Sequence, residues 1–413
     1  MHTPWTTFTR VVPALLGALA CSLVCSSGCA ADAAQLDDLS HLARRADVVR
    51  QRAMAHAYYL RSAYLRHRVM HALETARATT ATQEGIVDAM FFLERALECA
   101  PRSRYLWWEY AALNNGLGRV ANVITAYEHL NELEPRTDLM IKLGDLYQLR
   151  GDATRAVECY TTAFAREPDS AVLQERIADV YIEEGFKARR RDDDELAREQ
   201  FRRAITRMDA LCSTNAKSRW LVKKGLLHEL VGDEERALDV YQRAIAADAE
   251  NPDPYLRAAQ LQYAHGERAE RAGVPDEARR YFSQAADLLK VVVPEKKQQP
   301  EMLNFTAYVL ALSGTNLDVA ERLVSQALVH DAGNGAYIDT LGWVYFQRGD
   351  AQRALQKVER ALELEGEDAV ITDHLGDIYL RLGLPDKARA MWQKSLQLDA
   401  HNKAVEQKLR LLK

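Results

Sequence analysis

The sequence predicts an all-α fold, a right-handed α-solenoid of stacked helical hairpins. Two observations support this prediction. The 413 residues are rich in Ala, Leu, Glu and Arg, and only 11 are proline. Small residues also recur at intervals of 34, 47, 34, 48, 35 and 34 positions, at Gly144, Ala178, Gly225, Ala259, Ala307, Gly342 and Gly376. Regular spacing of this kind is typical of hairpins that bury a continuous core only when they stack.

The clearest repeat spans residues 137–170. Within it, Gly144 is followed three positions later by Tyr147. A glycine inside a helix costs about 1 kcal/mol relative to alanine, so its recurrence indicates two helices that approach closely. Gly151 and Asp152 then suit a turn, because Gly ends one helix and Asp caps the next. These residues resemble the tetratricopeptide-repeat family, and the resemblance covers roughly residues 104–402.

Residues 1–28 are typical of a lipoprotein signal peptide. Arg10 precedes an apolar run over residues 11–24 that is too short to span a bilayer, and Gly28 then precedes Cys29. This order resembles the lipobox of bacterial lipoproteins, which implies a lipid on Cys29, with Cys21 as the second choice. Ala30 implies, by the same resemblance, the outer membrane, with the chain facing the periplasm.

Residues 29–103 are interpreted as a linker and a degenerate capping repeat. Their arginines and tyrosines suit either contact with anionic headgroups or an ordinary solvated helix face. His67 and His71 lie one helical turn apart, so a metal-dependent enzyme is the alternative from another class. No third ligand is evident in the sequence, and we predict no metal and no cofactor.

Residues 104–299 form the predicted array, with two double repeats over 137–217 and 218–299. Seven extra residues follow Tyr181 and Tyr263, which extends each first helix by a heptad. The extended ends form a predicted projecting edge that contacts a partner, a membrane or only solvent. Its residues are Lys187, Arg189, Arg190, Arg191, Arg268 and Arg271. A regular trio of repeats, called the trio below, spans residues 300–402. A capping helix end over residues 403–413 completes the chain.

The concave groove of such a solenoid is lined by fixed positions of each first helix. Here those positions hold carboxylates and aromatic residues, namely Tyr105, Trp108, Asp138, Asp145, Glu175, Asp179, Glu229, Tyr308, Asp339, Trp343, Phe346, Asp373 and Asp377. An acidic, aromatic groove favours neutral or basic extended segments of a protein or peptide partner. We expect Trp343 and Phe346 to be exposed anchors, with packing of Trp343 between repeats as the alternative.

The net charge of −5 and the sequence pI near 6.2 argue against a nucleic-acid partner. No nucleophile or paired acid and base stands in a setting for catalysis, so we predict no small-molecule substrate and no enzyme. The repeats and the lipobox together resemble envelope lipoproteins, some of which are adaptors of carboxyl-terminal processing proteases. The sequence therefore predicts a lipid-tethered interaction scaffold or adaptor, or alternatively an assembly factor for outer-membrane or cell-wall machinery.

Overall fold

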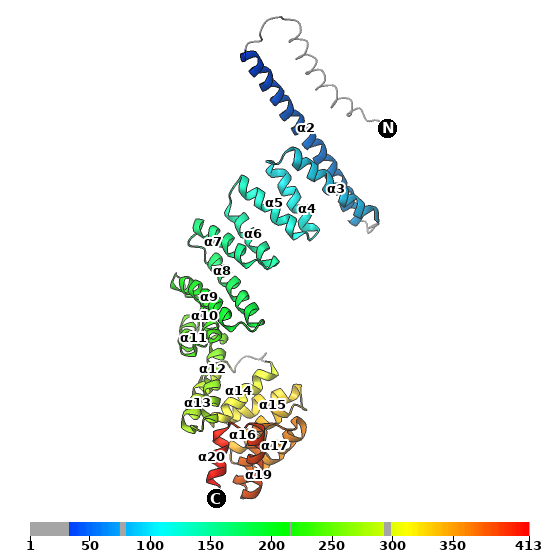
Figure 1. Cartoon of the computed structure of the whole chain (residues 1–413). Helices are drawn as coiled ribbons and strands as arrows, with labels where there is room; N and C mark the ends of the chain where they lie inside the picture. The colour runs from blue at the N-terminus through cyan, green and yellow to red at the C-terminus, as the bar shows by residue number, and fades with distance from the viewer. Residues whose placement is uncertain (1–32, 75–79, 215, 293–298, 413) are drawn as a thin grey trace. The chain divides into compact units, whose positions relative to one another are not determined.

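The computed structural model describes residues 33–74, 80–214, 216–292 and 299–412, with side chains left undescribed at residues 33–40, 42, 68–74, 80–84 and 214. Every element in these ranges is a helix, as predicted (Figure 1). The helices are α2 (Ala33–Glu74), α3 (Thr80–Cys99), α4 (Arg104–Gly116), α5 (Val120–Leu133), α6 (Thr137–Arg150), α7 (Ala153–Arg166), α8 (Ala171–Arg189), α9 (Asp194–Thr214), α10 (Ser218–Val231), α11 (Glu234–Ala247), α12 (Pro252–Arg271), α13 (Pro275–Val292), α14 (Pro300–Ser313), α15 (Leu317–His330), α16 (Gly335–Gln347), α17 (Ala351–Glu365), α18 (Ala369–Arg381), α19 (Pro385–Leu398) and α20 (Lys403–Leu411). The predicted signal peptide, Cys21 and Cys29 lie outside the described residues.

Consecutive helices pair into antiparallel hairpins, from α2 and α3 to α18 and α19, and α20 packs on α19. The contacts divide the chain into two compact units, residues 1–167 and residues 168–413. Within each unit, the second helix of one hairpin packs against the first helix of the next. Because each hairpin buries its apolar face on its neighbours, the core of the second unit is a row of clusters along its hairpins.

The turns inside the hairpins have the predicted chemistry. Gly151 ends α6 in the left-handed conformation, with φ of 81°, which glycine adopts without steric cost. Asp152 then caps α7, because its side chain accepts a hydrogen bond from the Arg155 amide at 3.2 Å. Gly349 and Asp350 repeat this arrangement between α16 and α17. The predicted Gly-Asp turns are therefore confirmed.

Glycine also permits close approach within the hairpins. A Cβ atom on Gly144 would lie 2.5 Å from Cε1 of Tyr160 on the facing helix, which is too close for a real contact. The fully buried Tyr160 ring fills the space that Gly144 leaves. The same relation links Gly266 to Phe282, where a Cβ would lie 2.5 Å from Cε1 of the ring. Helix α12 therefore approaches α13 closely at a glycine that the sequence reading did not use as a landmark.

The hairpins formed by α8 with α9 and by α12 with α13 are longer than their neighbours. Helices α8 and α12 have 19 and 20 residues, whereas α6, α10 and α14 each have 14. Their second helices are also long, with 21 residues in α9 and 18 in α13. In α12, Ala259 lies one heptad before Gly266, and both are buried. Each long hairpin thus has an additional packing layer, to which both helices contribute.

Helix α2 is 42 residues long, about twice the 20 residues of its partner α3. Figure 1 shows the first half of α2 extending beyond α3. Most described side chains from residue 41 to residue 53 are exposed, whereas Ala55 and Ser62 are buried. Within the described residues, no helix combines the length and apolar character needed to cross a membrane.

Candidate functional site

Several predicted groove carboxylates of the second unit bind groups on the next hairpin along the chain or on the last helix, α20. Glu175 on α8 accepts hydrogen bonds from Trp220 Nε1 at 3.1 Å and from Lys223 Nζ at 3.3 Å, both on α10. Asp179 accepts from the same Lys223 Nζ at 2.7 Å. These carboxylates therefore join neighbouring hairpins. Burial alone would raise the pKa of Glu175. The hydrogen bond from Trp220 and the charge and hydrogen bond of Lys223 outweigh this effect, so the pKa is lowered.

In the trio, carboxylates also pair with basic side chains of a following helix, and these pairs are more buried. Lys408 Nζ on α20 lies 2.8 Å from Asp373 Oδ1 and 2.8 Å from Asp377 Oδ2, both on α18. His374 Nδ1 lies 3.0 Å from Asp339 Oδ2 on α16. The exposed fractions of the His374 and Asp339 side chains are only 6% and 7%, so solvent hardly screens this pair.

Burial and charge oppose each other at these groups. Burial alone would lower the pKa of His374, but the carboxylates of Asp339, Asp373 and Asp377 raise it above its usual value. Burial likewise would lower the pKa of Lys408, but the two aspartates raise it. We therefore assign a charged imidazolium to His374 at mildly acidic pH.

Two further groove carboxylates accept hydrogen bonds from the tyrosines that pack on the hairpin glycines. Asp145 accepts from Tyr160 Oη at 2.5 Å, and Glu229 accepts from Tyr241 Oη. Burial is the main cause that raises the pKa of Tyr241, so this phenol stays a donor at neutral pH. These carboxylates hold their own hairpins together.

In the first unit, Asp138 also has a partner within the chain. Arg136 Nε donates to Asp138 Oδ1 at 2.9 Å, and this hydrogen bond lowers the pKa of Asp138. Trp108 is half-buried, with Lys142 Nζ 5.2 Å from the centre of its ring. All eight carboxylates predicted to line the groove thus interact with other residues of the chain. Sequence reasoning missed the partners Lys223, His374 and Lys408 because each lies about one repeat away from its carboxylate.

The aromatic residues of the trio form a stack. Trp343 stacks on His374 with ring centres 4.0 Å apart and on Phe346 with ring centres 4.8 Å apart. Trp343 is only 7% exposed, whereas Phe346 and Tyr308 are half-buried. The prediction that Trp343 is an exposed anchor is wrong, and its alternative, packing between repeats, describes its position. The indole ring lies nearly parallel to the His374 imidazole, with 16° between the ring planes.

At the predicted edge near residue 190, Arg190 and Arg191 are exposed in the turn between α8 and α9. Lys187 forms ion pairs with Glu183 and Glu184 on its own helix. Arg189 Nη2 donates to the carbonyl oxygen of Leu230 at 2.9 Å, so it caps the end of α10.

The other predicted edge, at the end of α12, contacts the last helices of the chain. Arg271 Nη2 lies 3.0 Å from Asp399 Oδ2, and Gln407 Nε2 donates to the Gly273 carbonyl oxygen at 3.2 Å. Arg268 forms an ion pair with Glu234 of α11. The end of α12 is therefore not a free projection. Its extra length brings it into contact with the C-terminal helix.

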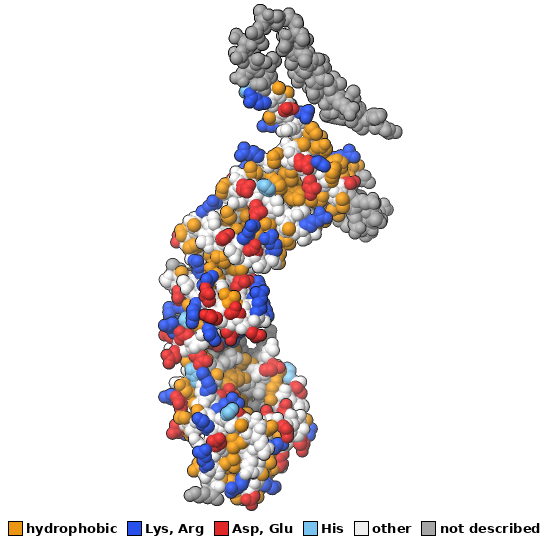
Figure 2. Space-filling model, in the orientation of Figure 1, with side chains coloured by type: hydrophobic (Ala, Val, Ile, Leu, Met, Phe, Trp, Pro, Cys, Tyr) orange, Lys and Arg blue, Asp and Glu red, His pale blue; other side chains and the backbone are white. Residues whose placement is uncertain are grey.

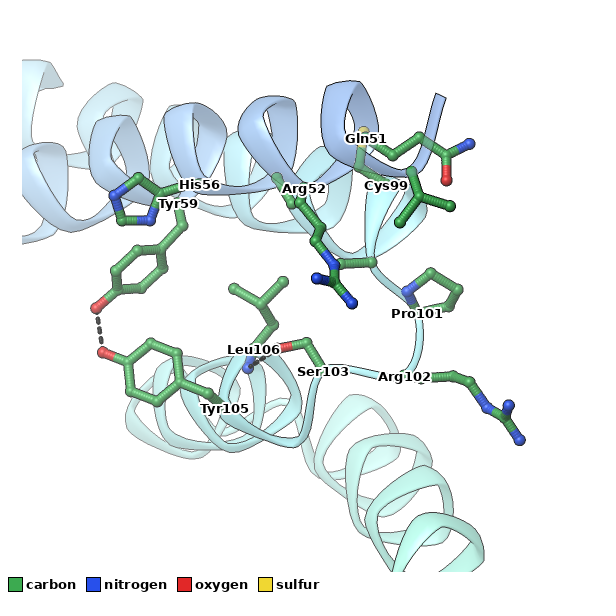
Figure 3. A pocket seen from close by; sticks show the side chains of 13 residues that line it. Gln51, Arg52, His56, Tyr59, Cys99, Pro101, Arg102, Ser103, Tyr105 and Leu106 are labelled. Atoms are coloured by element: carbon green, nitrogen blue, oxygen red, sulfur yellow. Dashed lines mark hydrogen bonds between the residues drawn. The ribbon is translucent and has the colours of Figure 1, made fainter. Parts of the chain in front are cut away.

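A cleft of about 790 Å³ in the first unit lies between α2 and the start of α4 (Figure 3). Tyr59 and Tyr105 join their hydroxyl groups at one end of it, and Arg52 extends from α2 into the space between the helices. The hydrogen bond with Tyr59 raises the pKa of Tyr105 to about 12. Sequence reasoning placed Tyr105 in a groove but did not identify the α2 side, because α2 has no clear repeat pattern.

The histidine pair gains no support as a metal site. His67 is exposed, and the side chain of His71 lies outside the described ones. Among the described side chains, no three His, Cys, Asp or Glu residues are grouped so that they could hold a metal ion.

Comparisons with known proteins agree with the repeat pattern. Family models described as "Tetratricopeptide repeat" match residues 137–170, 193–252 and 340–403. The chain is 31% identical over 109 residues to the photosystem I assembly protein Ycf3 of Prochlorococcus marinus, a match that covers 26% of this chain and 61% of that relative.

Solved structures with a similar fold include a tetratricopeptide repeat protein from Parabacteroides merdae, with 17% identity, 67% of this chain and 98% of that chain covered, and a TM-score of 0.35. Another is YrrB, described as a TPR protein with an unusual peptide-binding site. It is 18% identical, the match covers 49% of this chain and 98% of that chain, and the TM-score is 0.33. The family models cover the hairpins of α6 with α7, of α10 with α11 and of α18 with α19, and the first of these contains the Gly151-Asp152 turn and the contact of Gly144 with Tyr160. This chain is therefore a tetratricopeptide-repeat protein.

Proposed function

We propose that this chain is a non-catalytic scaffold that binds protein partners and is tethered by lipid in the bacterial envelope. The cleft between α2 and α4 is the observation that carries the scaffold proposal, because it combines exposed aromatic and aliphatic side chains with unpaired cations. Tetratricopeptide-repeat proteins bind peptide or protein partners. Figure 2 supports a protein partner over nucleic acid, because acidic and basic side chains alternate over the visible face.

The tether is proposed from the sequence around Cys29. Only residues 30–32 separate this cysteine from the start of α2, so a lipid there would hold α2 close to the membrane surface. Incorporation of labelled palmitate into the wild-type chain and into Cys29→Ser tests the proposal. We expect the variant to lose the label. Labelling that persists would contradict Cys29 and point to Cys21.

The finer role that we propose is delivery of substrates to an envelope protease. Neutral or basic partner segments remain our expectation for the concave groove. A basic segment would have to replace Lys223 or Lys408 at their carboxylates, whereas a neutral segment meets no such competition.

Crosslinked pull-down from envelope extracts tests the scaffold. We expect the wild-type chain to capture a reproducible set of proteins. A control chain that lacks the residues preceding α4, and therefore lacks the cleft, should not capture them. Recovery of no specific protein would contradict the scaffold. Comparison with Trp343→Ala/Phe346→Ala asks whether the trio takes part, and unchanged partners in that variant would exclude it.

An assembly factor for outer-membrane or cell-wall machinery is the second candidate. The similarity to a protein named as an assembly protein favours it, although the chain matches only 61% of that relative. Subunits of one machine among the captured partners would support assembly, whereas a protease together with its substrates would support delivery.

A further inference from the structure

The cleft between α2 and α4 is bounded by three segments of the first unit. Helix α2 supplies Val48, Arg52 and Tyr59, the loop after α3 supplies Arg102, and the start of α4 supplies Leu106. In Figure 3 the two helices lie on opposite sides of the space, with the tyrosine pair at one end. The volume of about 790 Å³ is enough for several side chains of a bound segment.

The charge of this cleft has one sign. Among its 13 lining residues, Arg52 and Arg102 are cations and His56 is a third basic group, but none is Asp or Glu. Arg52 and Arg102 are exposed, and neither forms an ion pair or a hydrogen bond in the described structure. The groove carboxylates of the same chain differ, because each has a partner. The cleft therefore keeps an unneutralised positive charge that attracts an anionic group.

The cleft also has apolar surface to cover. Val48 is 47% exposed and Tyr105 is 55% exposed, while Ala55 and Leu106 are buried at its base. The face of α2 that lines the cleft continues toward the N-terminus through Arg45, which lies at helical spacing from Val48 and Arg52. A ligand that matches this surface needs aliphatic groups beside carboxylates.

We propose that this cleft binds an acidic segment of a partner protein, with its carboxylates at Arg52 and Arg102 and its aliphatic side chains on the exposed Val48 and Tyr105. This inference rests on the proposed scaffold function and names the chemistry of the partner. A membrane surface with anionic headgroups would meet the arginines, but a flat bilayer does not enter a recess between two helices. The shape of the cleft therefore favours a protein segment.

Fluorescence anisotropy of the full chain with labelled peptides tests this proposal. The probes are a short peptide rich in Glu and Leu, its counterpart with Lys in place of every Glu, and vesicles of phosphatidylglycerol. We expect the Glu peptide to bind, the Lys peptide to bind at least roughly tenfold more weakly, and added salt to weaken the Glu complex.

Variants locate the binding. Arg52→Glu/Arg102→Glu is expected to weaken the Glu peptide roughly tenfold or more, whereas Arg52→Lys/Arg102→Lys keeps most of the affinity. Arg198→Glu is the matched control, because Arg198 on α9 is an exposed arginine without a described partner in the other unit. Val48→Ser, which removes apolar surface without adding charge, tests the apolar contribution separately, and it should also weaken the Glu peptide.

Equal binding of the Glu peptide by the wild type and the double Glu variant would overturn the proposal. Preference for the Lys peptide, or binding to the vesicles alone, would overturn it as well. The scaffold proposal would survive each of these results, because the pull-down from envelope extracts tests it independently.

Discussion

At the scale of single residues, the charged side chains of the concave face stabilise the fold. Glu175, Asp339 and Asp373 each contact a nitrogen on the next first helix of the array. Removing one partner of a buried pair is costly, because the remaining charge stays in a poorly solvated place. These carboxylates therefore have structural partners before any ligand arrives.

The pair of His374 and Asp339 predicts a pH dependence. The folded pKa of His374 is raised above its ordinary value of 6.5, so the folded state binds the proton more tightly than the unfolded state. This stabilisation is fully present below the unfolded pKa and is lost as the pH rises through the folded pKa. The advantage of the wild type over His374→Gln should therefore be largest below about pH 6.5 and should shrink as the pH rises above that value. Urea unfolding at several pH values measures the difference, and a constant difference would contradict the charged imidazolium.

The residue-level part of the site was only partly predictable from the sequence. Repeat positions identified the carboxylates, because a helical period fixes which residues share a face. They did not identify Lys408 as the partner of Asp373, because that contact depends on where the packing on α19 places α20. The burial of Trp343 was predicted only as an alternative, because it depends on stacking against His374 of another repeat.

At the scale of elements, the glycine-aromatic contact sets how closely the two helices of a hairpin pack. The Tyr160 ring lies where a Cβ on Gly144 would be, and Phe282 has the same relation to Gly266. The recurrence of glycine predicted the close approach of α6 and α7, but it did not identify Tyr160 as the residue that fills the space at Gly144. It did not reveal the second contact, because the landmark assigned to that hairpin was Ala259, one heptad earlier.

This contact gives a matched pair of substitutions. Gly144→Ala should destabilise the first unit by about 1–3 kcal/mol, because the new methyl group overlaps the buried Tyr160 ring. Gly116→Ala, at the end of α4, has no atom within 4 Å of the added Cβ and should be neutral or stabilise by up to about 1 kcal/mol. Thermal unfolding of both variants measures the effects. Equal stability of the two would contradict the close approach.

Within the second unit, the long α12 brings two distant parts of the sequence into contact. Gln407 of α20 donates to the Gly273 carbonyl oxygen just after α12, across 134 positions of sequence. The ion pair of Arg271 with Asp399 lies in the same region. The heptad spacing predicted the extra length of α12, but the contact that it makes depends on the packing of three intervening hairpins and is not a local property of the sequence.

Removal of Lys408, which lies on α20, tests the contact between α20 and the end of α12. Lys408→Ala should destabilise the second unit by about 1–3 kcal/mol, because Asp373 and Asp377 would lose their shared cation, while the 29% exposure of the Lys408 side chain limits the cost. Amide hydrogen exchange should become faster in α18, in α20 and at the end of α12. Helices α4 to α7 of the first unit should not change. Faster exchange confined to α20 would contradict a contact that links α20 to α18 and to the end of α12.

At the scale of the whole molecule, the chain combines an array whose concave charges are satisfied internally with one cleft whose charges are not. An acidic partner segment is therefore expected at residues 48–59 of α2 and at the start of α4 rather than at the carboxylates of the trio. Hydrogen exchange of the full chain, measured with and without a partner recovered in the pull-down, tests this expectation most directly. We predict that the partner slows exchange in these segments and leaves α16 and α18 unchanged, whereas protection confined to α16 and α18 would contradict it.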